Sequence, residues 1–348
     1  MEIPEALSDK MRNMAMFCAF LVVVIHCRPQ FETGTIAWWV KQFAEGGICR
    51  VAVPWFFAAS GFLTMAKWRG YGLLISRRLR TLMIPFVVWI VLFWMFLFSM
   101  SSLEHLSVNR QMLAYFTDWR LFCSKFGFWY RDCPVLSPLW YVRCLFCLTL
   151  AFPILKWGVT RLGRIWLVMM FGMYIFRTDL FCEDIRETAS LGPLAVEGLF
   201  YYSLGIWFAM RGGIPNARSL TFSVLSLSVG LCMAGILAVL SANGWPENSV
   251  VRSLVHSGIK FTEVPFMLVG VWGLMTARRL PTWLVSSSFA IYLIHKFVQV
   301  VLKNLWNAGA GMPQYFTMAV VSFAISLGIA VAMHRYMPKT SAVLFGGR

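Results

Sequence analysis

The chain has 348 residues, of which 59% are hydrophobic, 16% aromatic and only 13% charged, and its formal net charge is +16. A typical soluble domain is about 25% charged, so this composition excludes a soluble globular protein, and equally a disordered, collagen-like or small disulfide-bonded one. The mean hydropathy of +0.68 points the same way. We therefore expect an all-α, polytopic membrane helix bundle; long apolar runs without alternation exclude a membrane barrel.

Ten segments are long and apolar enough to cross a bilayer as helices. A spanning helix needs about 20 mostly apolar residues to cross about 30 Å of hydrocarbon. We expect one membrane domain over 1–348, with no appended soluble domain. The ten predicted spans are 12–29, 47–66, 82–100, 138–157, 164–180, 190–210, 219–241, 261–277, 283–304 and 315–337.

The basic residues are divided unequally between the two sides of these spans. If both termini share one side, the connections there hold 17 basic and three acidic residues, whereas the rest of the chain holds 14 and 12. Lys and Arg are in excess in cytoplasmic loops. We therefore expect both termini in the cytoplasm, in an inner (plasma) membrane. The bilayer then accounts for the positive charge, and no nucleic-acid partner is needed.

Seven ionisable side chains lie inside the predicted spans or at their ends, where charge is expensive and often marks a site. Five of them are expected at one depth near the extracytoplasmic surface, which favours a shared polar cavity; the alternative is that each is paired or interfacial on its own. These five are His26, Arg50, Arg143, Glu197 and Glu263, and the other two, His295 and Lys296, lie in the middle of the ninth span.

Two groups of side chains carry recognisable chemistry. His26 is the best catalytic candidate, because a neutral imidazole can take a proton from an attacking hydroxyl; the alternative is a packing residue. Arg77, Arg78 and Arg80 precede the third span, and Arg77 and Arg80 would share one face of a helix and suit a phosphate-rich ligand. The alternative is that these cations only orient the chain. No zinc-type spacing is present, so we expect no metal.

Five segments, in the right order, resemble the signatures of the membrane acyltransferase 3 family. They are the apolar run 20–26 that ends in histidine, the Val-Pro, aromatic and Ser-Gly-Phe run at 53–62, the Arg-x-x-Arg stretch at 77–80 followed by Ile-Pro-Phe at 84–86, the Leu-Trp-aromatic run at 138–142, and the Tyr-Leu-x-His run at 288–295.

One position departs from the family pattern. The family commonly places Arg or Lys eleven residues before the essential histidine, and here that position is Ala15. The nearest cation is Arg12, which lies about one helical turn further from His26, some 4.5 Å along the axis and about 60° around it. Arg12 is therefore the cation that could take this role.

The resemblance implies transfer of an acyl group, most often acetyl, from acyl-CoA to an extracytoplasmic sugar. Acetyl-CoA is then a donor substrate, and no permanently bound cofactor is expected. His26 would act as general base or transient acyl carrier. Arg77, Arg78, Arg80 and Arg12 would hold the donor phosphates; Arg143 or Arg50 would stabilise the oxyanion, and Glu197 or Glu263 would orient His26. Ser60, Trp140 and His295 are further substrate-binding candidates, and Ser60 could equally permit close helix packing.

Two other interpretations stay open. Ionisable residues in the membrane would also serve a polysaccharide exporter or a proton-coupled solute transporter. A catalytically inactive scaffold is favoured by the missing basic residue at position 15. For the acyltransferase, a glycan or lipid-linked sugar is the expected acceptor, and the aromatic-rich loop 101–137 is a candidate to bind it.

Overall fold

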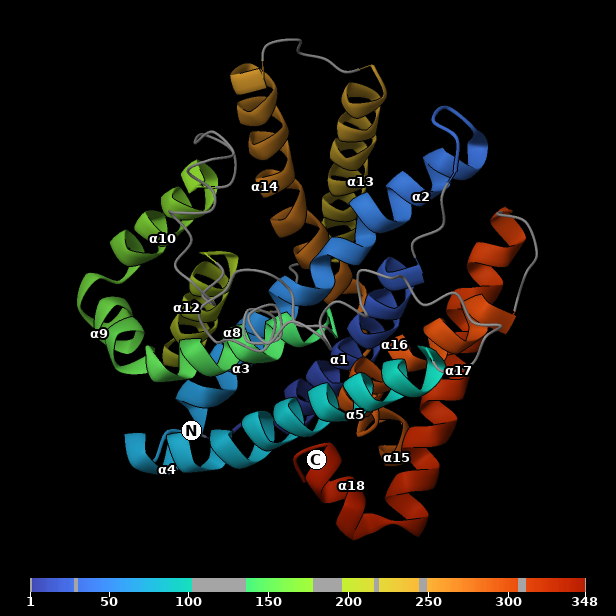
Figure 1. The fold of residues 1–348 in the computed structure, drawn as a ribbon. Helices are drawn as coiled ribbons and strands as arrows, with labels where there is room; N and C mark the ends of the chain where they lie inside the picture. The colour runs from blue at the N-terminus through green and yellow to red at the C-terminus, as the bar shows by residue number, and fades with distance from the viewer. Residues whose placement is uncertain are drawn as a thin grey trace.

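The computed structural model describes residues 2–27, 31–101, 136–177, 196–215, 219–243, 249–305 and 311–347, and within these ranges all regular structure is helical (Figure 1). The loop 101–137 lies almost wholly outside them. The helices, in chain order, are α1 (Glu5–Cys27), α2 (Ile36–Gly46), the 3₁₀-helix η1 (Ile48–Val51), α3 (Ala52–Ala66), α4 (Tyr71–Arg78), the π-helix η2 (Leu79–Met83), α5 (Ile84–Ser101), α8 (Leu139–Leu150), α9 (Phe152–Leu162), α10 (Arg164–Arg177), α12 (Val196–Met210), α13 (Leu220–Ala242), α14 (Ser249–Leu274), α15 (Thr282–Val285), α16 (Ser288–Leu305), α17 (Met312–Tyr336) and α18 (Pro338–Leu344).

Five stretches of the described chain are long and apolar enough to cross a membrane, and six if one bent helix pair counts as a span. They coincide with five of the ten predicted spans, which confirms a helical membrane protein. These stretches are Glu5–Cys27, Ile36–Ala66, Tyr71–Ser99, Leu220–Ala242 and Met312–Tyr336. Shorter apolar helices, Arg164–Tyr174 and Thr262–Leu274, lie in two further predicted spans.

Two of the boundaries that differ from the predicted spans bear on the site. The span expected at 138–157 is divided at Ala151 into α8 and α9, which meet at 63°. Pro153 lies two residues after Ala151, in the first turn of α9, and proline lacks the N–H that would continue the hydrogen bonds of α8. The span expected to begin at 261 belongs to a longer helix, α14, that begins at Ser249. Glu263 therefore lies inside a helix and does not open one.

The third span begins with a widened turn that the sequence explains. Pro85 cannot donate to the carbonyl of Thr81, and its ring crowds that carbonyl, so the preceding residues Leu79–Met83 adopt a π-helix. Gly346, whose φ is +68°, packs against the freed Thr81 carbonyl. A Cβ at Gly346 would overlap that carbonyl oxygen. Only glycine fits there, and the C-terminal segment thereby packs against this turn.

Glycines set the closest helix contacts. A Cβ at Gly61 of α3 would overlap the backbone oxygen of Tyr202 in α12, and one at Gly205 of α12 would overlap that of Ala58 in α3. Small residues let membrane helices approach closely and gain dispersion contacts.

The first helix lies among later ones: α1 packs against α3, α16 and α17. In Figure 1 both chain ends lie in the lower part, whereas the adjoining ends of α13 and α14 lie at the top.

Candidate active site

The two histidines of the long helices α1 and α16 lie next to each other. The ring centroids of His26, near the end of α1, and His295, in the middle of α16, are 5.2 Å apart, and the rings are tilted by 53°. His295 is fully buried and His26 partly so. The sequence placed His26 and His295 at different depths, but the packing of α1 on α16 brings them together.

A buried amide fixes the two helices at this point. Gln299, one turn after His295, is 1% exposed. Its Nε2 donates to the Val23 carbonyl at 2.8 Å and lies 3.4 Å from the Cys27 sulfur. These contacts lie on either side of His26 along α1, so Gln299 sets the position of α1 against α16 around the histidine pair.

Two tyrosines connect the histidine pair to a cavity. Tyr292, one turn before His295, has its ring centroid 6.2 Å from the His295 ring and 5.9 Å from that of Tyr141 in α8. The Tyr292 hydroxyl donates to the Pro138 carbonyl at the start of α8. Tyr141 and Ser60 have their hydroxyl oxygens 3.4 Å apart. The first turn of α8 thus lies deep in the bundle, beside α16, and not at an outer surface.

The cavity has a volume of about 530 Å³, and its lining combines the charged residues Glu2, Arg12 and Lys67 with hydroxyl-bearing and apolar side chains. Arg12 precedes His26 by 14 residues on α1, about 21 Å along the helix axis, whereas Tyr292 lies one turn from His295, beside His26, so Arg12 and Tyr292 lie at opposite ends of the cavity. On α3, Ser60 lies two turns before Lys67 and next to Tyr141. The remaining lining residues are Ile3, Ser8, Met11, Ala15, Trp55, Phe56, Ala59, Leu63, Tyr141, Leu145, Ser288 and Phe289. An apolar cleft with few polar groups is the usual form of a small-molecule site.

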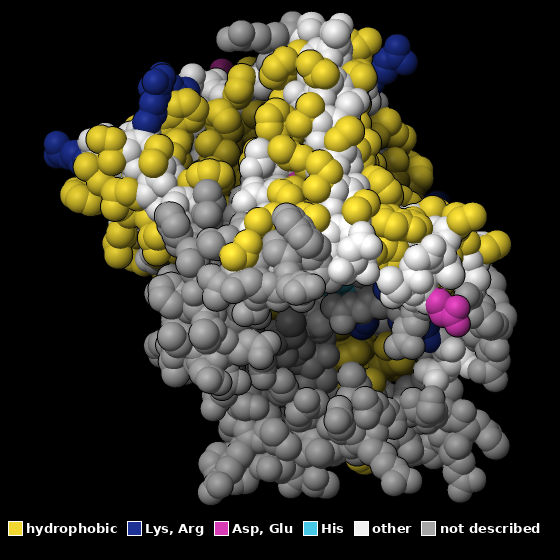
Figure 2. Space-filling view, turned by 90° about the horizontal axis from the view of Figure 1, so that it is seen from above, with side chains coloured by type: hydrophobic (Ala, Val, Ile, Leu, Met, Phe, Trp, Pro, Cys, Tyr) yellow, Lys and Arg dark blue, Asp and Glu magenta, His cyan; other side chains and the backbone are white. Residues whose placement is uncertain are grey.

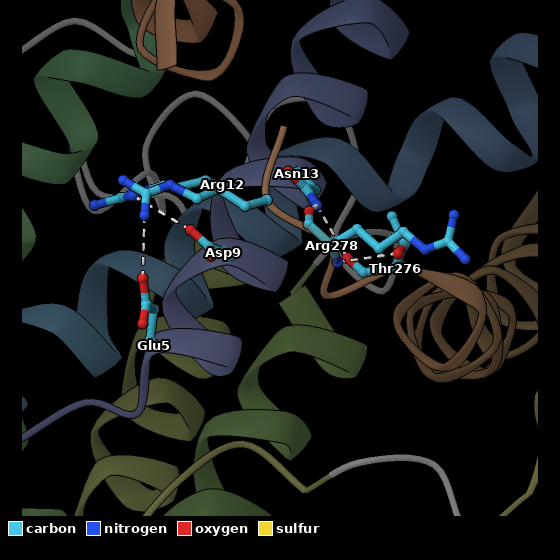
Figure 3. Close-up of polar contacts among 7 residues, drawn as sticks. Glu5, Asp9, Arg12, Asn13, Thr276 and Arg278 are labelled. Atoms are coloured by element: carbon cyan, nitrogen blue, oxygen red, sulfur yellow. Dashed lines mark hydrogen bonds and ion pairs between the residues drawn. The ribbon is translucent and has the colours of Figure 1, made fainter. Parts of the chain in front are cut away.

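Arg12 and Ala15 line the same cavity. The Arg12 side chain is 53% exposed and pairs with Asp9 at 3.4 Å. Next to it, the buried Asn13 side chain points to the segment between α14 and α15 and donates to the carbonyls of Thr276 and Arg278 at 3.0 and 2.9 Å (Figure 3). These bonds fix the rotation of α1 and hold Arg12 on the cavity side.

The basic stretch before the third span lies elsewhere. Arg77 and Arg80 are exposed and are not among the residues that line the cavity. Arg78 is half-buried and donates to the Thr64 hydroxyl of α3 at 2.8 Å. The expected shared face of Arg77 and Arg80 assumed an uninterrupted α-helix, but the π-helix begins between them, at Leu79. Lys67, which lies at the start of the same loop, does line the cavity.

Three residues of the predicted layer of ionisable residues lie near one another, and they are Arg50, Glu197 and Glu263. Arg50 lies in η1, and its Nη1 is 3.9 Å from Oε2 of Glu263, whose side chain is fully buried. Glu197, in the first turn of α12, interacts electrostatically with the nearby Tyr174, as Arg50 and Glu263 also do. Glu197 therefore lies near the Arg50–Glu263 pair, and the His26 ring lies beside that of His295.

Two further predicted residues lie in α8. Arg143 is 2% exposed, two residues after the cavity-lining Tyr141. Trp140 is half-buried, and its ring centroid is 6.3 Å from that of Phe57. Trp140 is not among the cavity-lining residues, so the structure gives it a packing contact.

Sequence reasoning missed Gln299, Tyr292 as a cavity residue, and Lys67. The signal for the first two was present: Tyr292, His295 and Gln299 are spaced i, i+3 and i+7, one face of a helix. Among the described residues, no group of three or more His, Cys, Asp or Glu side chains could hold a metal ion.

Figure 2 views the molecule from the end opposite the termini, where Lys or Arg side chains are visible beside hydrophobic ones. The cavity lined by the N-terminal half of α1 is a separate feature of the bundle. Together, the described helices and the buried histidine pair define a helical membrane protein with a polar site inside its bundle.

Comparison with known proteins names the family. Residues 14–335 match the family model described as "Acyltransferase domain", so the chain belongs to the acyltransferase 3 family and is an enzyme that transfers acyl groups. It is similar to the succinoglycan biosynthesis protein ExoH of Rhizobium meliloti (strain 1021), with 24% identity over 331 residues that cover 89% of this chain and 82% of the relative. No solved structure matches.

Proposed function

We propose that this enzyme transfers an acyl group, most simply acetyl, from cytoplasmic acyl-CoA to a hydroxyl of an extracytoplasmic or lipid-linked glycan. The observation that carries the proposal is that the 530 Å³ cavity ends at Tyr292, one helical turn from His295, whose ring lies beside that of His26. A thioester that enters the cavity from its basic end would point its acyl carbon toward the two imidazoles. The name of the similar protein, which refers to succinoglycan biosynthesis, supports a glycan acceptor.

The donor phosphates would bind at the basic end of this cavity. Arg12 and Lys67 line that end, and their charges suit a diphosphate. Arg77, Arg78 and Arg80 would extend the basic surface toward the remaining phosphate of the donor. The aromatic and aliphatic walls would then hold the uncharged arm of the donor, which suits a narrow apolar channel.

The reacting groups would come from α1, α8 and η1. His26 would act as general base or as transient acyl carrier. Arg143 is the better oxyanion group, because it is 2% exposed within the bundle, whereas Arg50 faces Glu263. Glu263 and Glu197 would hold Arg50 in place and support the outer part of the site.

This reaction needs a defined orientation. We propose ten crossings with both termini in the cytoplasm of the inner membrane, so that the cavity lined by the N-terminal half of α1 meets the donor. Figure 1 supports this arrangement, since both termini lie toward the same end of the molecule. The acceptor would then reach the histidines from the opposite end of the molecule.

The first prediction concerns His26. Membranes that carry the protein are given labelled acetyl-CoA, and the label in extracted glycan is compared between the wild type and His26→Ala. We expect a loss of about 100-fold or more, because general acid–base or nucleophilic catalysis contributes at least that much. His334→Ala is the control: His334 lies in the last turn of α17, where its ring nitrogen contacts the Ala330 carbonyl, and it does not line the cavity.

Undiminished labelling by His26→Ala would contradict the catalytic assignment. Uptake or export of a solute with no acyl transfer would instead favour a transporter. Masses of surface glycans from cells with and without the protein would identify the acyl group and its acceptor.

A further inference from the structure

The face of α16 beside His26 carries two buried hydrogen-bond acceptors that the fold does not use. His295 is 0% exposed and Gln299 is 1% exposed. Within the part of the chain that the structure describes, neither Nε2 of His295 nor Oε1 of Gln299 has a hydrogen-bond partner. The two residues are one helical turn apart, so their side chains are neighbours. Buried polar atoms are nearly always paired, and two open acceptors side by side indicate a place for a ligand that donates hydrogen bonds.

The proton on His295 can be assigned from its other nitrogen. Nδ1 lies 3.2 Å from the Ile291 carbonyl. A carbonyl only accepts hydrogen bonds, so Nδ1 carries the proton of the neutral ring and Nε2 holds the free electron pair. The helix backbone thus fixes His295 in the tautomer that a general base requires.

The orientation of the Gln299 amide is also determined. Its Nε2 donates to the Val23 carbonyl at 2.8 Å, which leaves Oε1 as the open atom. Both open atoms are therefore acceptors, and their common ligand must donate twice. Two hydroxyl groups of a sugar meet that requirement, whereas the thioester of the donor has no hydrogen to give.

We propose that His295 is the general base of the acceptor step, and that Gln299 Oε1 accepts a hydrogen bond from a second hydroxyl of the same sugar. This inference rests on the proposed acyl transfer to a glycan. In this proposal the neighbouring His26 ring carries the acyl group between the donor and the sugar.

Transfer then takes two balanced steps. A ring nitrogen of His26 attacks the thioester carbon, the carbon–sulfur bond breaks, and CoA leaves as a thiolate that takes up the proton lost by His26. The sugar hydroxyl next gives its proton to His295 Nε2, while its oxygen bonds to the acyl carbon. The bond from that carbon to His26 breaks, and His295 returns the proton to the leaving nitrogen. The adjacent rings, 5.2 Å between centroids, suit this last transfer.

The experiment separates the two steps with [¹⁴C]acetyl-CoA and membranes that carry the full chain. Three quantities are measured: CoA released, label bound to the protein after rapid separation, and label in extracted glycan. For His295→Gln we expect glycan labelling to fall by about 100-fold or more, while a burst of CoA release leaves label on the protein. His26→Ala should give neither bound label nor glycan label.

Two further variants keep the test decisive. His295→Gly leaves a space for added imidazole, which should restore glycan labelling at least in part; a role in folding alone would not be rescued. Gln299→Leu should lower glycan labelling by roughly 10-fold or more by raising the KM for the acceptor. This variant also loses the bond to the Val23 carbonyl, so the amount of label bound to the protein at saturating acetyl-CoA is measured with it and should stay near the wild-type amount if the histidine pair is still in place. His334→Gln, outside the site, should behave like the wild type.

Each alternative result has one meaning. The role given to His295 would be overturned if His295→Gln labels glycan normally. It would also be overturned if the CoA burst is lost and imidazole does not rescue His295→Gly. Absence of bound label in a His295→Gln protein that still releases CoA would overturn the acyl–His26 step. If even the wild type labels no glycan, the proposed function fails, independently of His295.

Discussion

At the scale of single residues, the position of positive charge on the cavity wall matters more than its amount. The chain has 31 basic residues, but Arg12 and Lys67 are the Arg and Lys side chains that line the described cavity. Arg77 and Arg80 are exposed, and an exposed cation contributes to binding only through a screened field. Arg12 and Ala15 lie one turn apart on the same wall, so a cation at either position would reach the same space.

This geometry predicts the effect of moving the charge. Arg12→Ala should raise the KM for acetyl-CoA by roughly 5- to 20-fold with little change in kcat, the effect of losing one charge-assisted hydrogen bond. Adding Ala15→Arg to Arg12→Ala should recover most of the loss. The measurement is the initial rate of CoA release at varied acetyl-CoA concentration.

Lys339→Ala is the control for this pair, since Lys339 is an exposed cation in α18 that does not line the cavity. An unchanged KM in Arg12→Ala would contradict the donor-binding role of Arg12. A double variant as weak as Arg12→Ala would show that position 15 does not reach the donor.

At the scale of helices, the site depends on how closely α3 and α12 pack, because α3 carries Ser60 to the cavity. Gly61 and Gly205 let the two backbones touch, and a methyl group at either would have to displace backbone atoms of the other helix. Backbone cannot move aside as the end of a flexible side chain can, so the cost of added volume is high here.

Gly205→Ala and Gly61→Ala are therefore expected to destabilise the fold by about 1–3 kcal/mol. The measurement is the fraction of protein that stays soluble in detergent after heating, which should fall at a temperature a few degrees lower. Gly172→Ala and Gly328→Ala are matched controls, because nothing lies within 4 Å of a Cβ built at either position. Equal stability of all four variants would show that α3 and α12 are not held this closely.

At the scale of the whole molecule, the unequal distribution of basic residues and the location of both termini toward one end support an even number of crossings. A phosphatase inserted after Asn243, at the end of α13, should be active outside the cytoplasm. Green fluorescent protein fused after Arg348 should fluoresce, which it does only inside the cell. If a phosphatase fused after Arg348 is active instead, the orientation is the opposite one. The basic cavity would then face away from cytoplasmic acyl-CoA.

Composition and hydropathy were sufficient to predict a helical membrane protein, because the bilayer requires long apolar helices whatever their partners. Local chemistry was readable as well, since His26 stands out as an ionisable group in an apolar run. The division of α8 from α9 at Ala151 was missed, because hydropathy alone does not record a 63° bend.

The arrangement of the site depended on tertiary packing. His26 and His295 are separated by most of the chain, and only the packing of α1 on α16, fixed by Gln299 and Val23, brings their rings to 5.2 Å. The same packing placed Arg12 and Lys67, and not Arg77 and Arg80, on the cavity wall. The sequence by itself therefore determined the class of protein and its candidate groups. Which of those groups meet was decided by the tertiary structure, since contacts between helices depend on rotation and depth that no single helix encodes.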